Sequence, residues 1–219
     1  MNDIIQTIAV YALPVLFAIT LHEAAHAYAA KYFGDSTAYL AGRMSMNPLK
    51  HIDLLGTIII PVALYLATSG AFLFGYAKPV PVVFEKLRNP KKQMAWVALA
   101  GPASNAAMAL LWMILTVLLR GLGVEETFFH AMARAGILVN LLMFAFNLVP
   151  IPPLDGGRIL TSLLPERLAQ PFSRIEPYGF FIVLGLIYFN VLSFWVAPLM
   201  SAADSVLRVL VSPLTLLLS

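Results

Sequence analysis

Residues 4–33, IIQTIAVYALPVLFAITLHEAAHAYAAKYF, form an apolar stretch long enough to cross a bilayer as a helix. Inside it lies the motif HEAAH, residues 22–26. His22 and His26 are four residues apart, so they project from one helix face and can share a zinc ion, while Glu23 can take a proton from zinc-bound water. Ionisable side chains are costly to bury in a bilayer, and we therefore interpret this group as a functional site.

The composition is that of a membrane protein. Of the 219 residues 60% are hydrophobic and 11% charged, which leaves too little polar surface for a soluble domain. The net charge of +3 is spread along the chain rather than clustered, so we expect no nucleic-acid partner. Since the chain has no cysteine, any metal must bind to His, Asp or Glu.

The pattern of apolar segments predicts an all-α polytopic integral membrane protein that forms a single domain over residues 1–219. We expect a catalytic core over about residues 4–160, followed by C-terminal helices over about residues 161–219. The segments lie at residues 4–33, 54–74, 95–119, 131–149 and 178–200, with one too short to span at 206–218.

A second motif, NLVPIPPLDGGR at residues 147–158, follows the fourth apolar segment. Its prolines and glycines end the helix and leave unpaired backbone groups, which a bilayer tolerates only beside protein or a wet cavity. Asp155 could there supply the third protein ligand of a catalytic zinc, with water in the fourth position. The alternative is an interfacial turn in which Asp155 is simply solvated.

The two motifs together resemble the site-2 protease family of intramembrane zinc metalloproteases, whose HExxH and NxxPxPxxDG patterns are both matched. The stretches NPLKHID (47–53), FGYAKPVP (74–81) and GPASN (101–105) are similar to the compact bacterial and archaeal members. The resemblance covers about residues 1–160. The sequence differs from better-studied members in showing no PDZ or CBS-like domain and no spanning helix before the zinc helix.

The resemblance implies one zinc per chain and transmembrane proteins as substrates. It implies that the zinc ligands are His22, His26 and Asp155, and that Glu23 is the catalytic base. Asn147 would then position the substrate or polarise the scissile carbonyl. We assign Asn105 to the same role, with hydrogen bonding between helices as its alternative.

Three further polar residues are candidates for orienting the zinc ligands. His51 and Asp53 could form such an outer layer, but a helix cap at Asp53, with His51 in a basic loop, is the favoured reading. Asn140 lies about two turns before Asn147 on a similar helix face, so it is either part of the site or a bridge between helices.

The position of the ligands constrains the topology. If every apolar segment between His26 and Asp155 spanned the bilayer, the ligands would emerge on opposite sides. The basic loop at residues 75–94 is expected in the cytoplasm, so residues 54–74 are predicted to be re-entrant or a tilted hairpin. We therefore expect about four spanning helices, an active site nearer the cytoplasmic face, and minor β content near it, at residues 38–46 or 80–84.

These observations predict an intramembrane zinc endopeptidase of the cell membrane. The resemblance to the site-2 proteases implies membrane-anchored regulators or signal-peptide remnants as its substrates. A metal-ion transporter using the same His and Asp ligands is the alternative from another class. Transport gives no reason for Glu23 beside His22, and it usually needs polar residues on several helices. A catalytically silent relative that binds helices is the third possibility, although every proposed catalytic position is occupied. The sequence names neither the substrate nor the oligomeric state.

Overall fold

The computed structural model describes residues 2–60, 63, 66 and 78–218. Within this part every regular element is a helix and none is a strand. The elements in chain order are α1 (Asn2–Tyr32), α2 (Thr37–Leu40), η1 (Pro48–Lys50), η2 (Leu54–Ile59), η3 (Phe84–Lys86), α4 (Pro90–Gly121), α5 (Thr127–Asn147), α6 (Asp155–Leu163), α7 (Glu166–Ser173), α8 (Glu176–Tyr188) and α9 (Ser193–Leu218).

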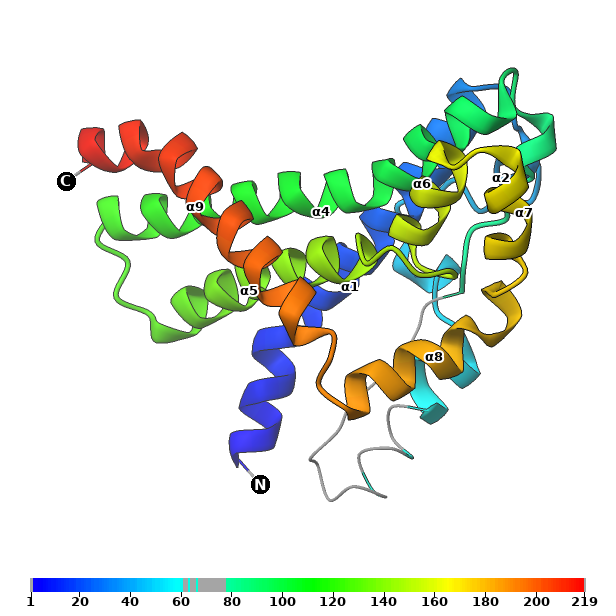
Figure 1. The fold of residues 1–219 in the computed structure, drawn as a ribbon. Helices are drawn as coiled ribbons and strands as arrows, with labels where there is room; N and C mark the ends of the chain where they lie inside the picture. Colours follow the sequence, from blue (N-terminus) through cyan, green and yellow to red (C-terminus); the bar gives the residue numbers. More distant parts are fainter. Residues whose placement is uncertain (1, 61–62, 64–65, 67–77, 219) are drawn as a thin grey trace.

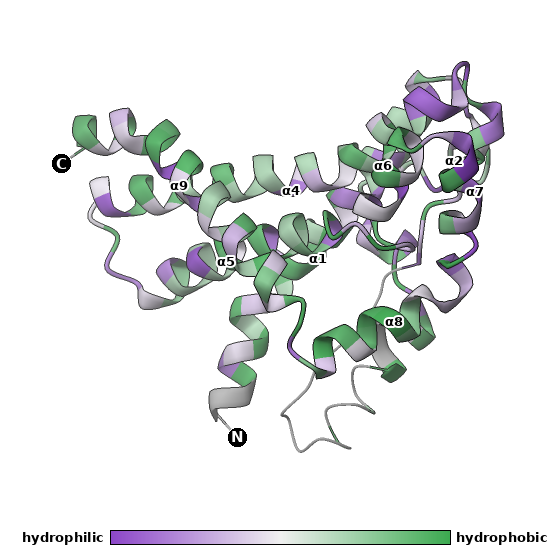
Figure 2. Ribbon diagram, viewed as in Figure 1, coloured by the Kyte–Doolittle hydropathy of each residue, from purple (hydrophilic) through white to green (hydrophobic). Residues whose placement is uncertain are grey.

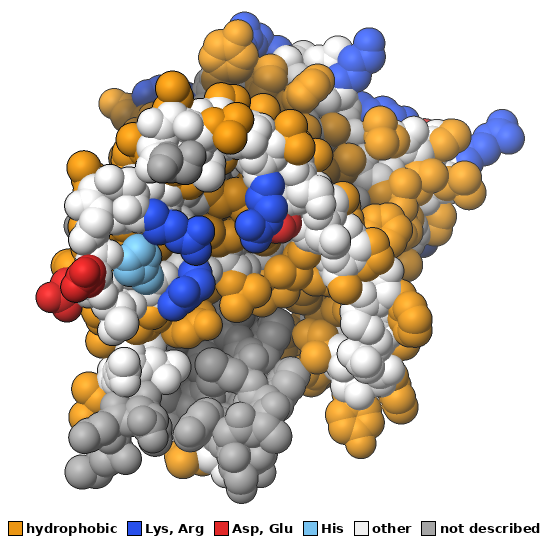
Figure 3. Space-filling model, turned by 90° about the vertical axis from the view of Figure 1, so that its left-hand side faces the viewer, with side chains coloured by type: hydrophobic (Ala, Val, Ile, Leu, Met, Phe, Trp, Pro, Cys, Tyr) orange, Lys and Arg blue, Asp and Glu red, His pale blue; other side chains and the backbone are white. Residues whose placement is uncertain are grey.

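In the described residues 4 helices are long and apolar enough to cross a bilayer, namely α1, α4, α5 and α9. Hydrophobic residues dominate these helices, whereas hydrophilic residues gather around α2, α6 and α7 (Figure 2). The view onto the side that carries the α4–α5 connection shows a mainly hydrophobic surface with a small group of Lys and Arg side chains (Figure 3). The prediction of an all-α polytopic membrane protein is confirmed.

Helix α4 is the centre of the bundle. It packs against α1, α5, α6 and α9, and it runs antiparallel beside α5 (Figure 1). Gly136 of α5 allows close packing, because a Cβ at this position would lie 2.2 Å from the Trp112 ring of α4. On the other side of this pair α9 contributes Leu207 and Val211 to an apolar core. The bundle thus provides a fixed frame on which α1 and α6 can meet.

The prediction of one spanning helix at residues 178–200 is wrong. The chain ends α8 at Tyr188, and Asn190 adopts a left-handed conformation with φ 56°, which Asn tolerates better than most residues. Residues 206–218 are not a separate short segment but the second half of α9. That helix continues through its charged residues because Arg208 pairs with Asp204 at 2.6 Å one turn away.

Neither segment predicted to contribute β structure forms a strand. Residues 38–46 contain the end of α2 and a turn, and residues 80–84 lead without a ladder into η3. Pro79 and Pro81 lack the backbone N–H that a strand ladder needs. The re-entrant segment predicted at 54–74 is described only at its start, where η2 is capped by Asp53, and most of its remainder lies outside the described residues.

Asp35 joins the end of α1 to the segment at residues 78–83, which we call the strap. Its carboxylate is fully buried and accepts the Thr37 N–H at 2.9 Å and the Val83 N–H at 2.7 Å. Burial by itself raises the pKa of the Asp35 carboxyl, but the hydrogen bonds from Thr37 and Val83 and the charge of Lys86 outweigh it, so the pKa lies below its ordinary value. The ionised carboxylate therefore stabilises the fold.

We expect Asp35→Asn to destabilise the protein by about 1–3 kcal/mol, because an amide cannot accept both buried N–H groups. Since the folded pKa is lower than the unfolded value of about 3.9, the stabilisation from Asp35 is present above that pH and is lost as the pH falls through the folded pKa. Thermal unfolding in detergent between neutral and acid pH measures both effects. The exposed Glu125→Gln is the control, and an equal acid response of Asp35→Asn and wild type would contradict the assignment.

Candidate active site

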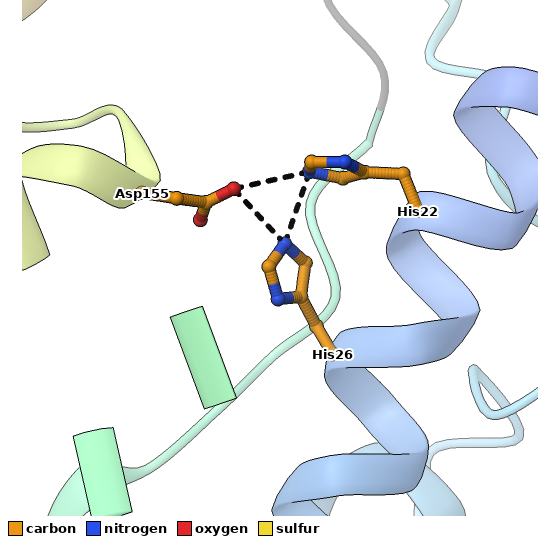
Figure 4. Close-up of side chains that lie close together, drawn as sticks. All are labelled: His22, His26 and Asp155. Carbon is orange, nitrogen blue, oxygen red and sulfur yellow. Dashed lines mark hydrogen bonds and ion pairs between the residues drawn. The ribbon is translucent and has the colours of Figure 1, made fainter. Parts of the chain in front are cut away.

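The structure brings His22, His26 and Asp155 together. The two histidines project from one face of α1, and Asp155 is the first residue of α6 (Figure 4). His22 Nε2 lies 3.0 Å from His26 Nε2, and Asp155 Oδ2 lies 3.2 Å from the first and 3.3 Å from the second. His22 and Asp155 are buried, with 5% and 6% of their surface exposed. The structure thus places the three residues that the sequence suggested as zinc ligands side by side.

The hydrogen bonds of the histidines identify the nitrogen that faces the cluster. His26 donates from Nδ1 to the Val97 carbonyl at 2.7 Å, and a carbonyl can only accept. His22 Nδ1 lies 2.7 Å from Asn105 Oδ1, while the Asn105 amide nitrogen donates to the Ala18 carbonyl. In the neutral imidazoles each Nε2 therefore carries a lone pair directed at Asp155.

Three electron-pair donors in so small a space fit a divalent metal. Tetrahedral zinc with ligand bonds of about 2.0–2.2 Å places its ligand atoms about 3.3–3.6 Å apart, close to the separations found here. Burial alone would raise the pKa of Asp155, but the neighbouring His26 and His22 outweigh this effect. The pKa of Asp155 therefore lies below its ordinary value, and the carboxylate is ionised. Its buried Oδ2 has no hydrogen-bond partner among the described residues, as expected for an atom that binds a metal.

The glycines after Asp155 allow α6 to begin at the required place. A Cβ on Gly156 would lie 2.3 Å from the Leu148 carbonyl oxygen, and one on Gly157 would lie 2.2 Å from the Pro152 nitrogen. The backbone between α5 and α6 therefore folds tightly against the first turn of α6. Because Asp155 begins that turn, the proline- and glycine-rich motif positions the carboxylate opposite α1.

One face of α4 supports both histidines. Val97, Gly101 and Asn105 are spaced four residues apart, so they lie along a single stripe of the helix. Val97 binds His26, Asn105 binds His22, and Gly101 lies between them. A Cβ on Gly101 would be 2.4 Å from His26 Nε2. No role in the site was predicted for Val97 and Gly101 from the sequence, although a glycine inside an apolar helix is a signal of close packing.

Asn105 forms hydrogen bonds between helices. It is fully buried behind His22, and its amide nitrogen also donates to Asn140 Oδ1 at 3.1 Å. Asn140 in turn donates to the Gly136 carbonyl of its own helix. A chain of hydrogen bonds thus runs from His22 through Asn105 to Asn140, and it connects α1, α4 and α5. Hydrogen bonding between helices, the alternative weighed for Asn105, is what the structure shows.

The other polar candidates have local partners. His51 donates from Nε2 to the Ser45 carbonyl at 2.7 Å, and Asp53 accepts the Gly56 N–H as the cap of η2. For Asp53 the structure thus shows the favoured cap. Asn147 is half-buried at the end of α5 and donates to the Met143 carbonyl.

Glu23 has a partner that the sequence did not indicate. Its Oε2 accepts the backbone N–H of Val80 at 2.8 Å. The strap therefore passes beside the residue that follows the first zinc-site histidine.

Comparison with known proteins identifies the family. The profile of peptidase family M50 matches residues 123–189, which contain the proline- and glycine-rich motif. YwhC of Bacillus subtilis, a zinc metalloprotease by provisional assignment, is 37% identical over 202 residues, covering 90% of this chain and 88% of YwhC. The chain belongs to peptidase family M50. Zinc is the cofactor of this M50 peptidase, and the His-His-Asp group is a site that could hold it.

Two further relatives of this M50 peptidase are the Rip2 proteins, which are also provisionally assigned as zinc metalloproteases. Rip2 of Mycolicibacterium smegmatis is 32% identical over 187 residues, which is 82% of this chain and 67% of Rip2. Rip2 of Mycobacterium tuberculosis is 28% identical over 184 residues, with the same coverage of 82% and 67%. No solved structure matches the M50 peptidase significantly.

We expect Gly101→Ala to weaken zinc binding by roughly tenfold or more, because the new Cβ would lie 2.4 Å from His26 Nε2 and displace the ring. Zinc content after competition with a chelator measures the effect. Gly185→Ala in α8 is the matched control, since its Cβ would meet no atom of the described residues within 4 Å. Equal zinc retention by the two variants would show that a Cβ at position 101 does not displace the histidines.

Asn105→Leu tests the hydrogen-bond chain. The side chains are similar in volume, but His22 Nδ1 loses its acceptor, and we expect zinc affinity to fall by about 10–100-fold. The same chelator competition applies. Ser104→Ala at the preceding position is the control, because within the described part of the chain that hydroxyl bonds only the Gly101 carbonyl of its own helix. The role assigned to Asn105 is wrong if its variant binds zinc like wild type.

Proposed function

We propose that this M50 peptidase is an intramembrane endopeptidase that hydrolyses peptide bonds within or near transmembrane segments of membrane-anchored proteins. One observation carries the proposal: two of the three converging donors, His22 and His26, lie with Glu23 in a helix of membrane-spanning length, and Asp155 of α6 meets them there. His22 and His26 fall in the span Ile5–Tyr32. Water and a peptide must therefore reach the site at membrane depth.

The site lies near one end of its helix. From Ile5 to His22 the helix rises about 26 Å, within a hydrocarbon core about 30 Å thick. The loops that follow the C-terminal end of α1 are rich in Lys and Arg, which favours a cytoplasmic location for that end of the helix. We therefore place the active site near the cytoplasmic face of the cell membrane.

The residues divide the reaction between them. Bound by His22, His26 and Asp155, zinc supplies Lewis acidity that makes water a nucleophile near neutral pH and polarises a carbonyl. Glu23 accepts the proton from the attacking water and later donates it to the leaving amine. Val97 and Asn105 hold the two imidazoles in the tautomer that presents Nε2. Asn147, at the end of α5, would contact the substrate backbone.

A transmembrane substrate must unwind before it can react. Its carbonyls are hydrogen-bonded within its own helix, and the attacked bond has to be exposed. Substrates with helix-breaking residues near the cleavage site should therefore be preferred. Membrane-anchored regulators and the remnants of signal peptides both belong to this substrate class.

The first test compares wild type with Glu23→Gln in detergent, measuring zinc content and cleavage of a panel of model transmembrane substrates. Gln keeps an oxygen that can accept the Val80 N–H but cannot serve as a base. We expect one zinc in both proteins and a loss of cleavage by about 10²–10⁴-fold in the variant. The exposed Glu125→Gln should cut like wild type.

Two results would contradict the proposal. If wild type binds zinc but cuts no member of the panel, metal transport or silent helix binding becomes the better account. If Glu23→Gln cuts as fast as wild type, Glu23 is not the base.

A further inference from the structure

The strap, residues 78–83, is held at three points along its length. The Lys78 N–H donates to the His51 carbonyl at 3.0 Å, and the Val83 N–H donates to Asp35 Oδ2 at 2.7 Å. Between them the Val80 N–H donates to Glu23 Oε2 at 2.8 Å. The two outer bonds tie the strap to the loop before η2 and to the end of α1, and the middle bond reaches the proposed base.

The sequence of the strap limits which backbone groups can donate. Pro79 and Pro81 have no N–H, so Val80 carries the single donor between them. In an extended chain the donors of neighbouring residues point to opposite sides, and the prolines remove the two donors that flank Val80. The strap thus has one donor at its centre, and it is directed at Glu23.

Packing of the Val80 side chain fixes the distance between the strap and α1. It is buried, with 7% of its surface exposed, and packs against Ala27 of α1 and Ala38 of α2. Arg43 adds a hydrogen bond from Nη2 to the Lys78 carbonyl at 2.7 Å. The Val80 N–H is therefore placed by packing and by hydrogen bonds that do not involve Glu23, as a preorganised donor must be.

We propose that Val80 is a positioning residue for the reaction: its backbone N–H holds one oxygen of the Glu23 carboxylate, so that the other oxygen is directed at the attacking water. The proposal rests on the role of Glu23 as base given above. A glutamate side chain rotates about several bonds, and a base is effective only within hydrogen-bond reach of its proton. The hydrogen bond from the strap restricts the rotation of the Glu23 side chain before substrate binds.

The arrangement also gives functions to two residues that do not bind the metal. Asp35 and His51 hold the ends of the strap, so they act on Glu23 through the backbone of residues 78–83. From the sequence, orienting a zinc ligand was one of two alternatives for His51. Its backbone carbonyl instead supports the segment that orients the base.

The test removes only the N–H of Val80. Replacement Val80→α-hydroxyvaline, introduced by nonsense suppression, converts the backbone amide to an ester and keeps the isopropyl side chain. We expect kcat on a model transmembrane substrate to fall roughly tenfold or more, as for loss of a hydrogen bond to a charged group, with KM and zinc content unchanged. The same replacement at Val82, whose N–H makes no recorded hydrogen bond within the described residues, should leave all three values as in wild type.

The outcomes separate positioning from simple packing. An unchanged kcat in the Val80 ester overturns the proposal, and so does an equal loss in the Val82 ester or a loss of zinc, since either indicates general damage to the strap. A rise in kcat overturns it as well, because the N–H would then compete with substrate for Glu23. If Glu23→Gln is inactive and the Val80 ester is fully active, only this inference fails. If wild type itself cuts nothing, the proposed function fails and the inference falls with it.

Discussion

The Nε2 atoms of His22 and His26 and the Oδ2 atom of Asp155 lie within 3.3 Å of one another, where little solvent reaches them. Lone pairs this close repel each other unless a cation lies between them, and a buried carboxylate adds the cost of its own desolvation. A bound zinc ion would relieve both, and its ligands would link α1 to α6, two helices far apart in the sequence.

The rest of the core can be understood as the frame that this cluster requires. Helix α4 lies against α1 and α6, and its Val97, Gly101 and Asn105 follow the spacing of the histidines. A larger residue at position 101 would push the helices apart, and an apolar residue at position 105 would leave an imidazole N–H unpaired. His22, His26 and Asn105 are tolerated at membrane depth because each has a hydrogen-bond partner on a neighbouring helix.

The strap supplies the hydrogen-bond donor to Glu23, which the described parts of the spanning helices do not supply. The bundle holds the three donor atoms from α1 and α6, whereas the recorded partner of Glu23 is a backbone N–H at residue 80. Its position depends on Asp35 and His51 at the ends of the strap, so residues outside the spanning helices contribute to the geometry of the site. A site built this way combines a rigid metal position with a base held by a separate segment.

The sequence by itself determined the membrane class and the pair of histidines on one helix face, because apolar length and i, i+4 spacing are local properties. The helix break at the prolines and glycines left open whether Asp155 is a ligand or a solvated turn residue, and its place beside the histidines was implied only by the family resemblance. The prediction from the sequence was wrong for the C-terminal helices, because the turn at Asn190 and the pairing of Asp204 with Arg208 are weak local signals. Only the tertiary structure decided that Asn105 lies behind His22 and that Val80 binds Glu23, since both depend on the register between segments that are distant in the chain.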